Sequence, residues 1–195
     1  MGKLVAQEFS SLDGVAQAPS YPDEDTSGGF AHGGWNTRFM DDESMEWVIG
    51  NITEAGSYLL GRRTYETFAA HWPNASEQEQ VVARPLNERP KYVASTTLTA
   101  PLAWQNSTLL DGDLVTAVAK LTADDDVHVI GSTQLVRFLT VHGLVDEYRI
   151  MLDPILLGGG KRYFPDDGTV MPLRLLESRV TATGALLATY ATARD

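Results

Sequence analysis

The chain has 195 residues, of which 43% are hydrophobic and 21% are charged, a composition typical of a globular domain and unlike that of disordered or fibrous proteins. It contains no cysteine, which excludes thiolate metal sites, disulfides and a cysteine nucleophile. Its formal net charge of −11 opposes binding to nucleic acid or to an anionic membrane, so we expect neither as a partner.

The beginning of the chain predicts a strand followed by a long loop. Residues 4–9 form an apolar-rich run typical of a strand, and Asp13-Gly14 after it indicates a turn. Residues 17–38 contain two prolines, four glycines and three aromatic residues in one irregular stretch. Loops of this length in compact domains are usually lids, binding loops or disordered segments, and the aromatic residues favour an ordered lid.

The same region carries no targeting or membrane signal. Polar residues interrupt the first eight positions, so we expect no secretion signal, and no apolar run reaches the length of about 18 residues that indicates a membrane span. We therefore expect a cytoplasmic protein.

A first helix is expected after the loop. Asp41 and Asp42 suit a helix N-terminus, because carboxylates accept hydrogen bonds from its free N–H groups and complement its dipole. Met45, Ile49 and Ile52 then recur at helical spacing and predict one apolar face. The helix is expected to continue to about residue 56.

A strand and further helical segments come next. Residues 57–60 are apolar and predict a buried strand that ends at Gly61. Thr64 is predicted to be the N-cap of a second helix that stops before Pro73. Residues 77–83 predict a further helical piece.

Two more strand and helix pairs follow the same order. Residues 91–95 predict a strand, and Asp113 is expected to cap a helix with apolar residues on one face. Residues 127–130 predict another strand. The helix after it starts at about Thr133 and ends at Gly143, a glycine in the position that often terminates helices.

The carboxyl-terminal part changes from alternation to consecutive strands. Tyr148, Ile150 and Leu152 alternate with other residues, and residues 173–181 and 185–192 predict two strands joined by a turn. This order predicts one α/β domain over residues 1–195, with a mostly parallel central sheet, helices on both faces and an antiparallel C-terminal edge.

Small, hydroxyl and cationic residues follow three of the expected strands. In open sheets of this kind, ligands bind beyond the carboxyl ends of the strands. Glycine lets the backbone approach a phosphate, hydroxyls and helix N-terminal amides hydrogen-bond to it, and arginine matches its oxygens. Taken singly, each residue is more often a turn or a cap, but together they predict a phosphate site built from three loops. These loops are Gly61-Arg62-Arg63-Thr64, Ser95-Thr96-Thr97 and Gly131-Ser132-Thr133.

Other common chemistries are not supported by the sequence. There is no G-x-G-x-x-G fingerprint, and Gly158-Gly159-Gly160-Lys161 lacks the upstream glycine and the following hydroxyl of a phosphate-binding P-loop. The four histidines fall in no metal-ligand spacing, and no G-x-S-x-G elbow is present. We predict no metal site.

The order of motifs resembles the dihydrofolate reductase superfamily, specifically the riboflavin-biosynthesis reductase (RibD C-terminal) branch. The resemblance covers nearly the whole chain and implies a dihydrofolate-reductase-like fold. The segments that carry it are Ser11-Leu12-Asp13-Gly14-Val15, residues 59–66, Val93-Ala94-Ser95-Thr96, residues 129–134, Gly143-Leu144-Val145-Asp146-Glu147 and residues 154–165.

The resemblance implies NADPH as the cofactor. Its phosphates would be bound near Gly61, Arg62, Arg63 and Thr64, its 2'-phosphate end also by Ser95 and Thr96, and its pyrophosphate by Gly131, Ser132 and Thr133. The nicotinamide would lie toward Asp13, Gly14 and Val15. One departure from the family is that Gly131-Ser132 replaces the usual Gly-Gly.

The position of the proton donor departs from the family more seriously. Folate reductases use a carboxylate on the first helix, and counting back from Gly61 places Met45 at that position. Asp42 lies about 60° from Met45 around a helix and Glu46 about 100°, so Asp42 is the first candidate for the acid and Glu46 the second. Alternatively, both are ordinary acids of a helix start.

We therefore expect an NADPH-dependent reductase that transfers hydride to a small, heterocyclic C=N or C=O substrate. One alternative is a stand-alone riboflavin-pathway reductase of a ribosylated pyrimidine, and another is an NADPH-binding protein without catalysis, which Met45 motivates. We also expect a homodimer formed through the C-terminal strands, because the adjacent Leu186 and Leu187 face opposite sides of a strand.

Overall fold

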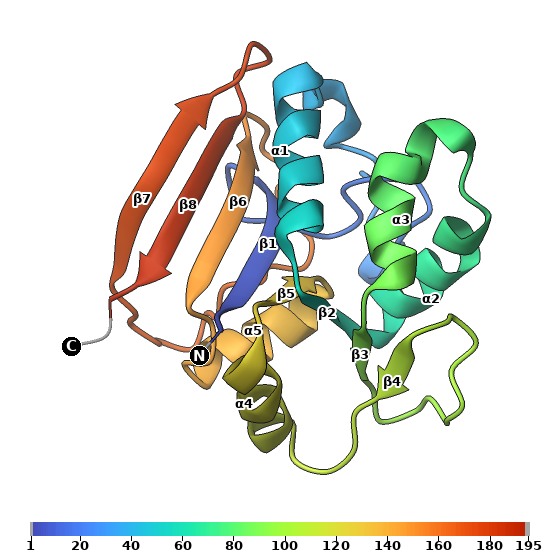
Figure 1. The fold of residues 1–195 in the computed structure, drawn as a ribbon. Coiled ribbons are helices and arrows are strands. Elements are labelled where there is room, and N and C mark those ends of the chain that lie inside the picture. The colour runs from blue at the N-terminus through green and yellow to red at the C-terminus, as the bar shows by residue number, and fades with distance from the viewer. Residues whose placement is uncertain (1, 194–195) are drawn as a thin grey trace.

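The computed structural model describes residues 2–193 and contains an eight-stranded sheet with the order β4-β3-β2-β5-β1-β6-β8-β7 (Figure 1). The six strands from β4 to β6 pair in parallel, and β8 pairs antiparallel with both β6 and β7. This confirms the predicted mostly parallel α/β sheet with an antiparallel C-terminal edge. The strands are β1 (Leu4–Ser11), β2 (Ser57–Gly61), β3 (Lys91–Ala94), β4 (Ser107–Leu109), β5 (Val127–Ile130), β6 (Glu147–Asp153), β7 (Leu173–Val180) and β8 (Leu186–Thr192).

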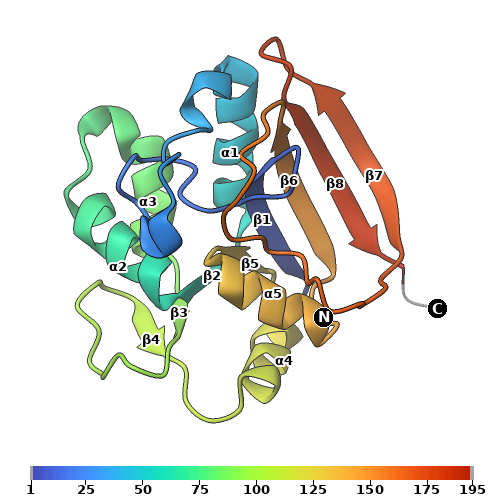
Figure 2. The ribbon, with the colours of Figure 1, turned by 180° about the vertical axis from the view of Figure 1, so that it is seen from behind.

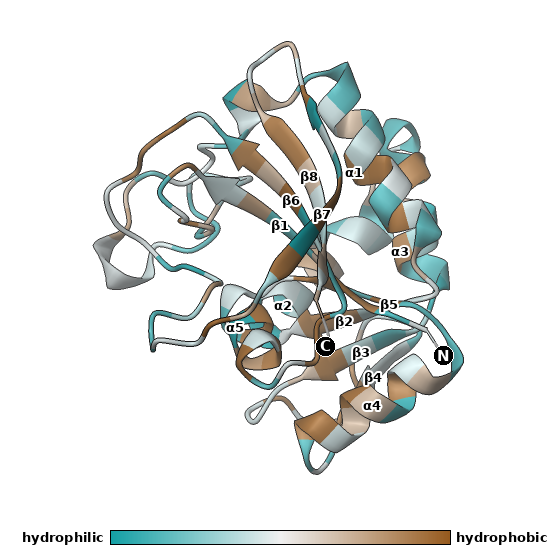
Figure 3. Cartoon of the chain, turned by 90° about the vertical axis from the view of Figure 1, so that its left-hand side faces the viewer, coloured by the Kyte–Doolittle hydropathy of each residue, from teal (hydrophilic) through white to brown (hydrophobic). Residues whose placement is uncertain are grey.

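Helices cover both faces of the sheet (Figures 1 and 2). They are α1 (Asp42–Glu54), α2 (Arg62–His71), α3 (Gln80–Glu88), α4 (Leu114–Asp124) and α5 (Thr133–Val141). Apolar residues are concentrated along β6 and β8, whereas α1 and α4 carry apolar and polar residues in turn (Figure 3). None of the helices within the described residues is long and apolar enough to cross a membrane.

Alternation along β2 divides the interior into two cores. Tyr58 and Leu60 point to one face and pack with residues of α1, α2 and α3, whereas Leu59 points to the other and packs with residues of α4 and α5. All three side chains have 0% exposure. Full burial of a leucine side chain stabilises a fold by roughly 1.5–3 kcal/mol, so a buried parallel strand of this kind anchors both helical layers.

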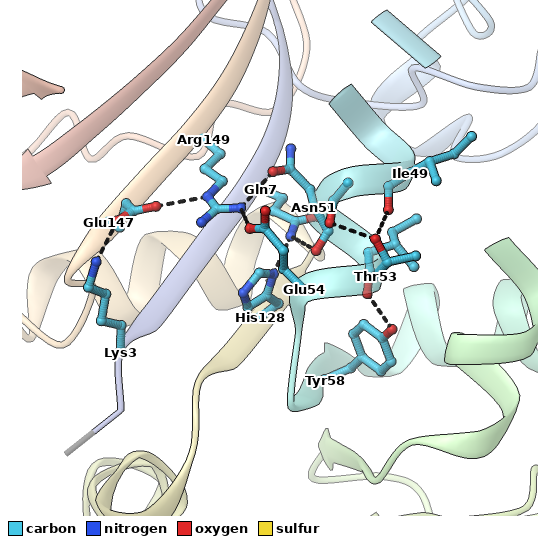
Figure 4. Close-up of polar contacts among 12 residues, drawn as sticks. Lys3, Gln7, Ile49, Asn51, Thr53, Glu54, Tyr58, His128, Glu147 and Arg149 are labelled. Atoms are coloured by element: carbon cyan, nitrogen blue, oxygen red, sulfur yellow. Dashed lines mark hydrogen bonds and ion pairs between the residues drawn. The ribbon is translucent and has the colours of Figure 1, made fainter. Parts of the chain in front are cut away.

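A buried polar cluster fixes α1 to the sheet (Figure 4). Nε2 of Gln7 donates to the carbonyl of Asn51 at 3.0 Å and lies 2.5 Å from Nδ1 of His128. Arg149 donates to Oδ1 of Asn51 and to Oε2 of Glu54, both at 2.7 Å. Burial, together with the positive charge of Arg149, lowers the pKa of His128 to about 4, so the ring is neutral and the cluster is a structural link.

Helix boundaries differ from the predictions at two places. Helix α2 begins at Arg62 with Gly61 as its N-cap, so the prediction that Thr64 is the cap is wrong and this residue lies inside the first turn. The reason is that β2 runs directly into the helix through the extended backbone of Gly61. The helical piece predicted over 77–83 consists of a 3-10 turn, η4 (Glu77–Glu79), and α3, which continues to Glu88.

The loop of residues 17–38 is folded onto the carboxyl end of the sheet. It contains the 3-10 turns η1 (Ser27–Gly29) and η2 (Thr37–Phe39), the second ending one residue beyond the loop. Trp35 is buried and its Nε1 donates to the carbonyl of Gln17 at 2.8 Å, while Nδ2 of Asn36 donates to Asp153 at 2.8 Å. These contacts position the loop beside the ends of β1 and β6.

Candidate active site

A cavity of about 560 Å³ lies at the carboxyl ends of β2 and β3 and at the start of α5. It brings together the three loops that the sequence singled out. The predicted residues that line it are Gly61, Arg62, Arg63, Ser95, Thr96, Ser132 and Thr133. The carboxyl ends of parallel strands meet at one edge of the sheet, which explains why segments 30 or more positions apart in the chain converge here.

Close backbone packing shapes the centre of this cavity. A Cβ atom on Gly61 would overlap Oγ of Ser132, and the N–H of Gly61 donates to the carbonyl of Gly131 at 3.3 Å. Gly131 has a φ of +66°, a backbone conformation that favours glycine. The serine at position 132 therefore fits in place of a second glycine because Gly61 has no side chain to meet it.

Two helices begin at the cavity with free N–H groups. The N-caps of α2 and α5 are Gly61 and Ser132, and within the described residues neither forms a side-chain cap hydrogen bond. The first-turn amides of both helices are thus available, and the helix dipoles favour an anion in front of them. Oγ of Ser95 accepts from the N–H groups of Thr97 at 3.1 Å and Leu98 at 3.0 Å, which orders the loop after β3.

Three cationic side chains line the same cavity. Arg62 pairs with Glu66 at 3.4 Å, and both side chains are nearly half exposed. Arg63 donates to Oδ1 of Asp25 at 2.6 Å, and Lys161 donates to Oδ2 of Asp25 at 2.5 Å. Burial alone would raise the pKa of Asp25, but the hydrogen bonds from Lys161 and Ser27 outweigh it and hold the pKa at about 2.

A smaller cavity of about 150 Å³ adjoins the first. Both are lined by Asp25, Arg63, Ser132 and Thr133, so the two cavities are neighbours, and together they are called the cleft. The predicted residues Thr64 and Gly131 line the smaller part, together with two acids that the sequence analysis did not select, Glu8 of β1 and Glu24 of the 17–38 loop.

The turn after β1 lies outside the cleft. Asp13 accepts from Oγ of Ser11 at 2.6 Å and from the N–H groups of Leu157 at 3.1 Å and Gly158 at 2.8 Å, and the hydrogen bond from Ser11 is the main reason its pKa falls to about 2. Val15 is fully buried under the segment that contains Gly160. Asp13, Gly14 and Val15 line neither part of the cleft, because the turn instead anchors the 154–160 segment.

The acids of α1 also lie away from the cleft. Asp42 and Glu46 are exposed, and neither lines either cavity. The rotation of the helix about its axis explains this. Asp41 is the N-cap, and its Oδ1 accepts a hydrogen bond from the N–H of Ser44 at 2.9 Å. Ser44 and Ile52 lie on the buried side of the helix. Asp42 and Glu46, four residues apart, therefore share the outer side, and the structure does not support their expected role as proton donors.

Sequence reasoning missed four charged residues of the cleft, which are Glu8, Glu24, Asp25 and Lys161. Glu8 had a detectable signal, because it is an acid inside an otherwise apolar strand segment. Lys161 directly follows three glycines, but that motif was tested only against the P-loop pattern. Asp25 had no signal, because its place depends on how the 17–38 loop folds back over the sheet.

The residues of the larger cavity fit a phosphate-rich dinucleotide. They combine arginine and lysine cations, several hydroxyl groups and two helix N-termini, all of which bind phosphate oxygens. A volume of about 560 Å³ is within the common range for small-molecule and cofactor sites.

Comparison with known proteins supports the same fold. Residues 2–187 match the family model of the RibD C-terminal domain. The chain is 23% identical over 143 residues to the uncharacterized protein YyaP of Bacillus subtilis, covering 71% of this chain and 75% of YyaP.

Three solved structures have similar folds. A protein assigned to riboflavin biosynthesis from Shewanella sp. PV-4 has a TM-score of 0.70 at 19% identity, over 98% of this chain and 99% of the other. A pyrimidine reductase-like protein of Corynebacterium diphtheriae has a TM-score of 0.69 at 13% identity, over 100% and 93%. RibD of Acinetobacter baumannii has a TM-score of 0.66 at 15% identity, with all of this chain covering 59% of that longer protein.

Proposed function

Because the chain belongs to the RibD C-terminal domain family, we propose that it is an NADPH-dependent reductase that transfers hydride to a small heterocyclic substrate with a C=N or C=O bond. The observation that carries this proposal is the cleft. Cations, hydroxyls and two helix N-termini line its larger cavity, and a smaller cavity lies beside it. The larger part suits the phosphates of the cofactor, and the smaller part leaves room for a substrate.

Each group of residues has a defined task in this proposal. Arg62, Arg63, Ser95 and Thr96 would bind the 2'-phosphate end, and Ser132 and Thr133 with the first amides of α5 would bind the pyrophosphate. The bound cofactor supplies the hydride. The chain contributes binding, orientation and exclusion of water, and the 17–38 loop assists by covering the cleft with Glu24 and Asp25.

Cofactor preference tests this proposal. Fluorescence titration of the purified protein should give a dissociation constant for NADPH at least 10-fold lower than for NADH, because the arginines gain charge-assisted hydrogen bonds only with the 2'-phosphate. Equal affinities, or a preference for NADH, would exclude Arg62 and Arg63 as ligands of the 2'-phosphate.

A more specific reaction is favoured by two similar folds. The Corynebacterium diphtheriae protein is pyrimidine reductase-like, and the Acinetobacter baumannii protein is RibD. On this basis the second candidate is a stand-alone reductase of a ribosylated pyrimidine in riboflavin synthesis. NADPH oxidation on addition of such a ribosylaminopyrimidine tests it, and the absence of oxidation would leave the broader proposal as the better one.

A third candidate is an NADPH-binding protein without catalysis. This candidate rests on the position of α1. Its residues Met45, Asp42 and Glu46 are exposed and lie outside the cleft, so this helix provides no acid there. Oxidation of NADPH in the presence of any C=N or C=O acceptor would remove this candidate.

A further inference from the structure

Glu8 is carried into the smaller cavity by the alternation of β1. Leu4 and Ala6 of the same strand face belong to the core that includes residues of α5. The next residue on this face is Glu8, which lies where that core ends and lines the cavity beside Gly131 and Ser132. The strand therefore places a carboxyl group, and not another apolar side chain, at the inner end of the cleft.

The carboxyl group of Glu8 is available to a ligand. Its Oε1 is buried and has no hydrogen-bond partner among the described residues. Buried polar atoms are almost always paired, so an unpaired buried carboxyl oxygen on a residue that lines a cavity points to a partner outside the chain, such as a ligand in that cavity. The cavity also holds Glu24, but Oε2 of Glu24 already accepts from the N–H groups of Ser20 at 2.8 Å and Tyr21 at 3.3 Å.

The charges around Glu8 favour its neutral form. Burial, together with the negative charge of Glu24, raises the pKa of Glu8 from its ordinary value to about 8. The other ionisable groups near it are Asp25 and Arg63, which pair with each other across the cavity, and Tyr163, whose raised pKa keeps it neutral. Glu8 therefore carries a proton at neutral pH.

We propose that Glu8 is the acid that protonates the substrate in the smaller cavity, an assignment that rests on the proposed reductase function. In the balanced step, the carbon of the C=N or C=O bond would gain one hydrogen and two electrons as hydride, which a bound dihydronicotinamide would supply and be oxidised in doing so. The O–H bond of Glu8 breaks, and an N–H or O–H bond forms on the substrate heteroatom. Glu8 is left as a carboxylate and recovers its proton from water. The acid thus comes from the central strand of the sheet and not from α1.

The experiment compares wild-type protein with two variants. Glu8→Gln keeps the shape of the side chain but has no acid proton, and Glu8→Asp keeps the carboxyl group on a side chain that is one methylene shorter. Glu88→Gln, an exposed glutamate at the end of α3, is the matched control. Four quantities are measured: the dissociation constant for NADPH, the carboxylic-acid carbonyl band in infrared difference spectra without cofactor, the rate of a single turnover with excess enzyme, and its pH profile. The probe substrate is the cyclic imine 3,4-dihydroisoquinoline.

The expected result is specific to a proton donor. Glu8→Gln should bind NADPH within about 2-fold of wild type but reduce the imine about 10²-fold or more slowly, a loss typical of removing a general acid. Glu8→Asp should recover part of the rate. The wild-type rate should fall as pH rises through about 8, and the fall in Glu8→Gln should be only that caused by loss of the proton of the imine itself. The wild-type spectrum at pH 7 should contain an acid carbonyl band that Glu8→Gln lacks and Glu88→Gln retains.

The contrary outcomes separate the two proposals. If wild-type protein does not bind NADPH, the proposed function is wrong. If it binds NADPH but does not reduce the imine, or if Glu8→Gln reduces it at the wild-type rate, the assignment of Glu8 is wrong while the cofactor site stands. An infrared spectrum that shows Glu8 ionised at pH 7 would also overturn the assignment.

Discussion

Oδ1 of Asp25 lies 2.6 Å from Nη1 of Arg63. A carboxylate of the 17–38 loop therefore forms an ion pair with an arginine that we propose to bind the phosphates of NADPH. The other oxygen of Asp25 holds Lys161 at 2.5 Å. One carboxylate therefore pairs with two of the three cations in the cleft. A cofactor phosphate that enters must share these cations with Asp25 or displace it.

The first prediction is that Asp25→Asn strengthens NADPH binding by about 3- to 10-fold, because it removes a negative charge from the phosphate site and frees both cations. Titrations at low and high salt measure the effect, which should shrink as salt screens the charges. Asp23→Asn, an exposed aspartate of the same loop, is the control for net charge alone. Weaker NADPH binding by Asp25→Asn would show that the carboxylate positions the cations for the cofactor.

The second prediction concerns Arg62. Arg62→Ala should weaken NADPH binding by roughly 10- to 100-fold, as expected for the loss of a hydrogen bond to a charged group, and should weaken NADH binding much less. The fold should tolerate this change, because the pair with Glu66 is long at 3.4 Å and exposed. Arg84→Ala on α3 is the control, since that side chain is also exposed but lies outside the cleft. Equal losses for the two cofactors would exclude a contact with the 2'-phosphate.

The third prediction is a pH-dependent gain of stability in Glu8→Gln. The pKa of Glu8 is about 8 in the folded protein against an ordinary value of 4.5, so between these values the folded state holds a proton that the unfolded state loses. Wild-type stability from this group therefore falls as pH rises from about 4.5 to 8. Denaturant unfolding should show Glu8→Gln equal to wild type near pH 4 and more stable by roughly 4 kcal/mol near pH 8. An equal difference at both pH values would contradict the raised pKa.

The fourth prediction separates the acids at the start of α1. Asp41→Ala should lower the melting temperature by a few degrees, because the N–H groups of Ser44 and Thr183 lose their acceptor. Asp42→Asn and Glu46→Gln should leave both the melting temperature and the rate of hydride transfer unchanged, since both side chains are exposed outside the cleft. A 10²-fold slower reduction in Asp42→Asn would restore that residue as the acid.

The fifth prediction is that the protein forms a homodimer through its C-terminal strands. Strand β7 is at the edge of the sheet and exposes Leu175, Leu176 and Val180 at 50%, 43% and 66%. The pairing of β7 with β8 has a register shift at Leu176, and the exposed side chains give this edge an apolar surface. Light scattering at micromolar concentration should give twice the monomer mass, and Leu176→Lys should lower it. A monomer in wild-type protein would exclude this dimer.

Much of the fold could be predicted because local sequence patterns indicate most of its strands and helices. Apolar runs such as residues 57–60 and 127–130 alternate with helical periodicity, and the change to consecutive strands after residue 147 predicts the antiparallel edge. Strand β4 was not predicted, because three residues without a strong pattern give no signal until they pair with β3. The cap of α2 was misplaced by three residues because strand and helix join without a linker.

The site was predicted only where it depends on strand ends. Arg62, Ser95 and Ser132 follow strands directly, so the topology of a parallel sheet brings them together. Asp25 and Lys161 reach the cleft from two irregular segments whose packing depends on contacts across more than 130 positions of the chain. For α1, an error of one residue in the predicted N-cap turns the predicted faces of the helix by about 100°. The spacing of its acids alone does not determine which of them face the sheet.

The most direct test of the account is a crystal structure of the protein with NADPH bound. We predict that the 2'-phosphate lies against Arg62, Arg63, Ser95 and Thr96, that the pyrophosphate meets the start of α5 at Ser132 and Thr133, and that the nicotinamide points into the smaller cavity toward Glu8. Cofactor density outside this cleft, or a nicotinamide at the arginine end with the adenosine toward Glu8, would contradict it.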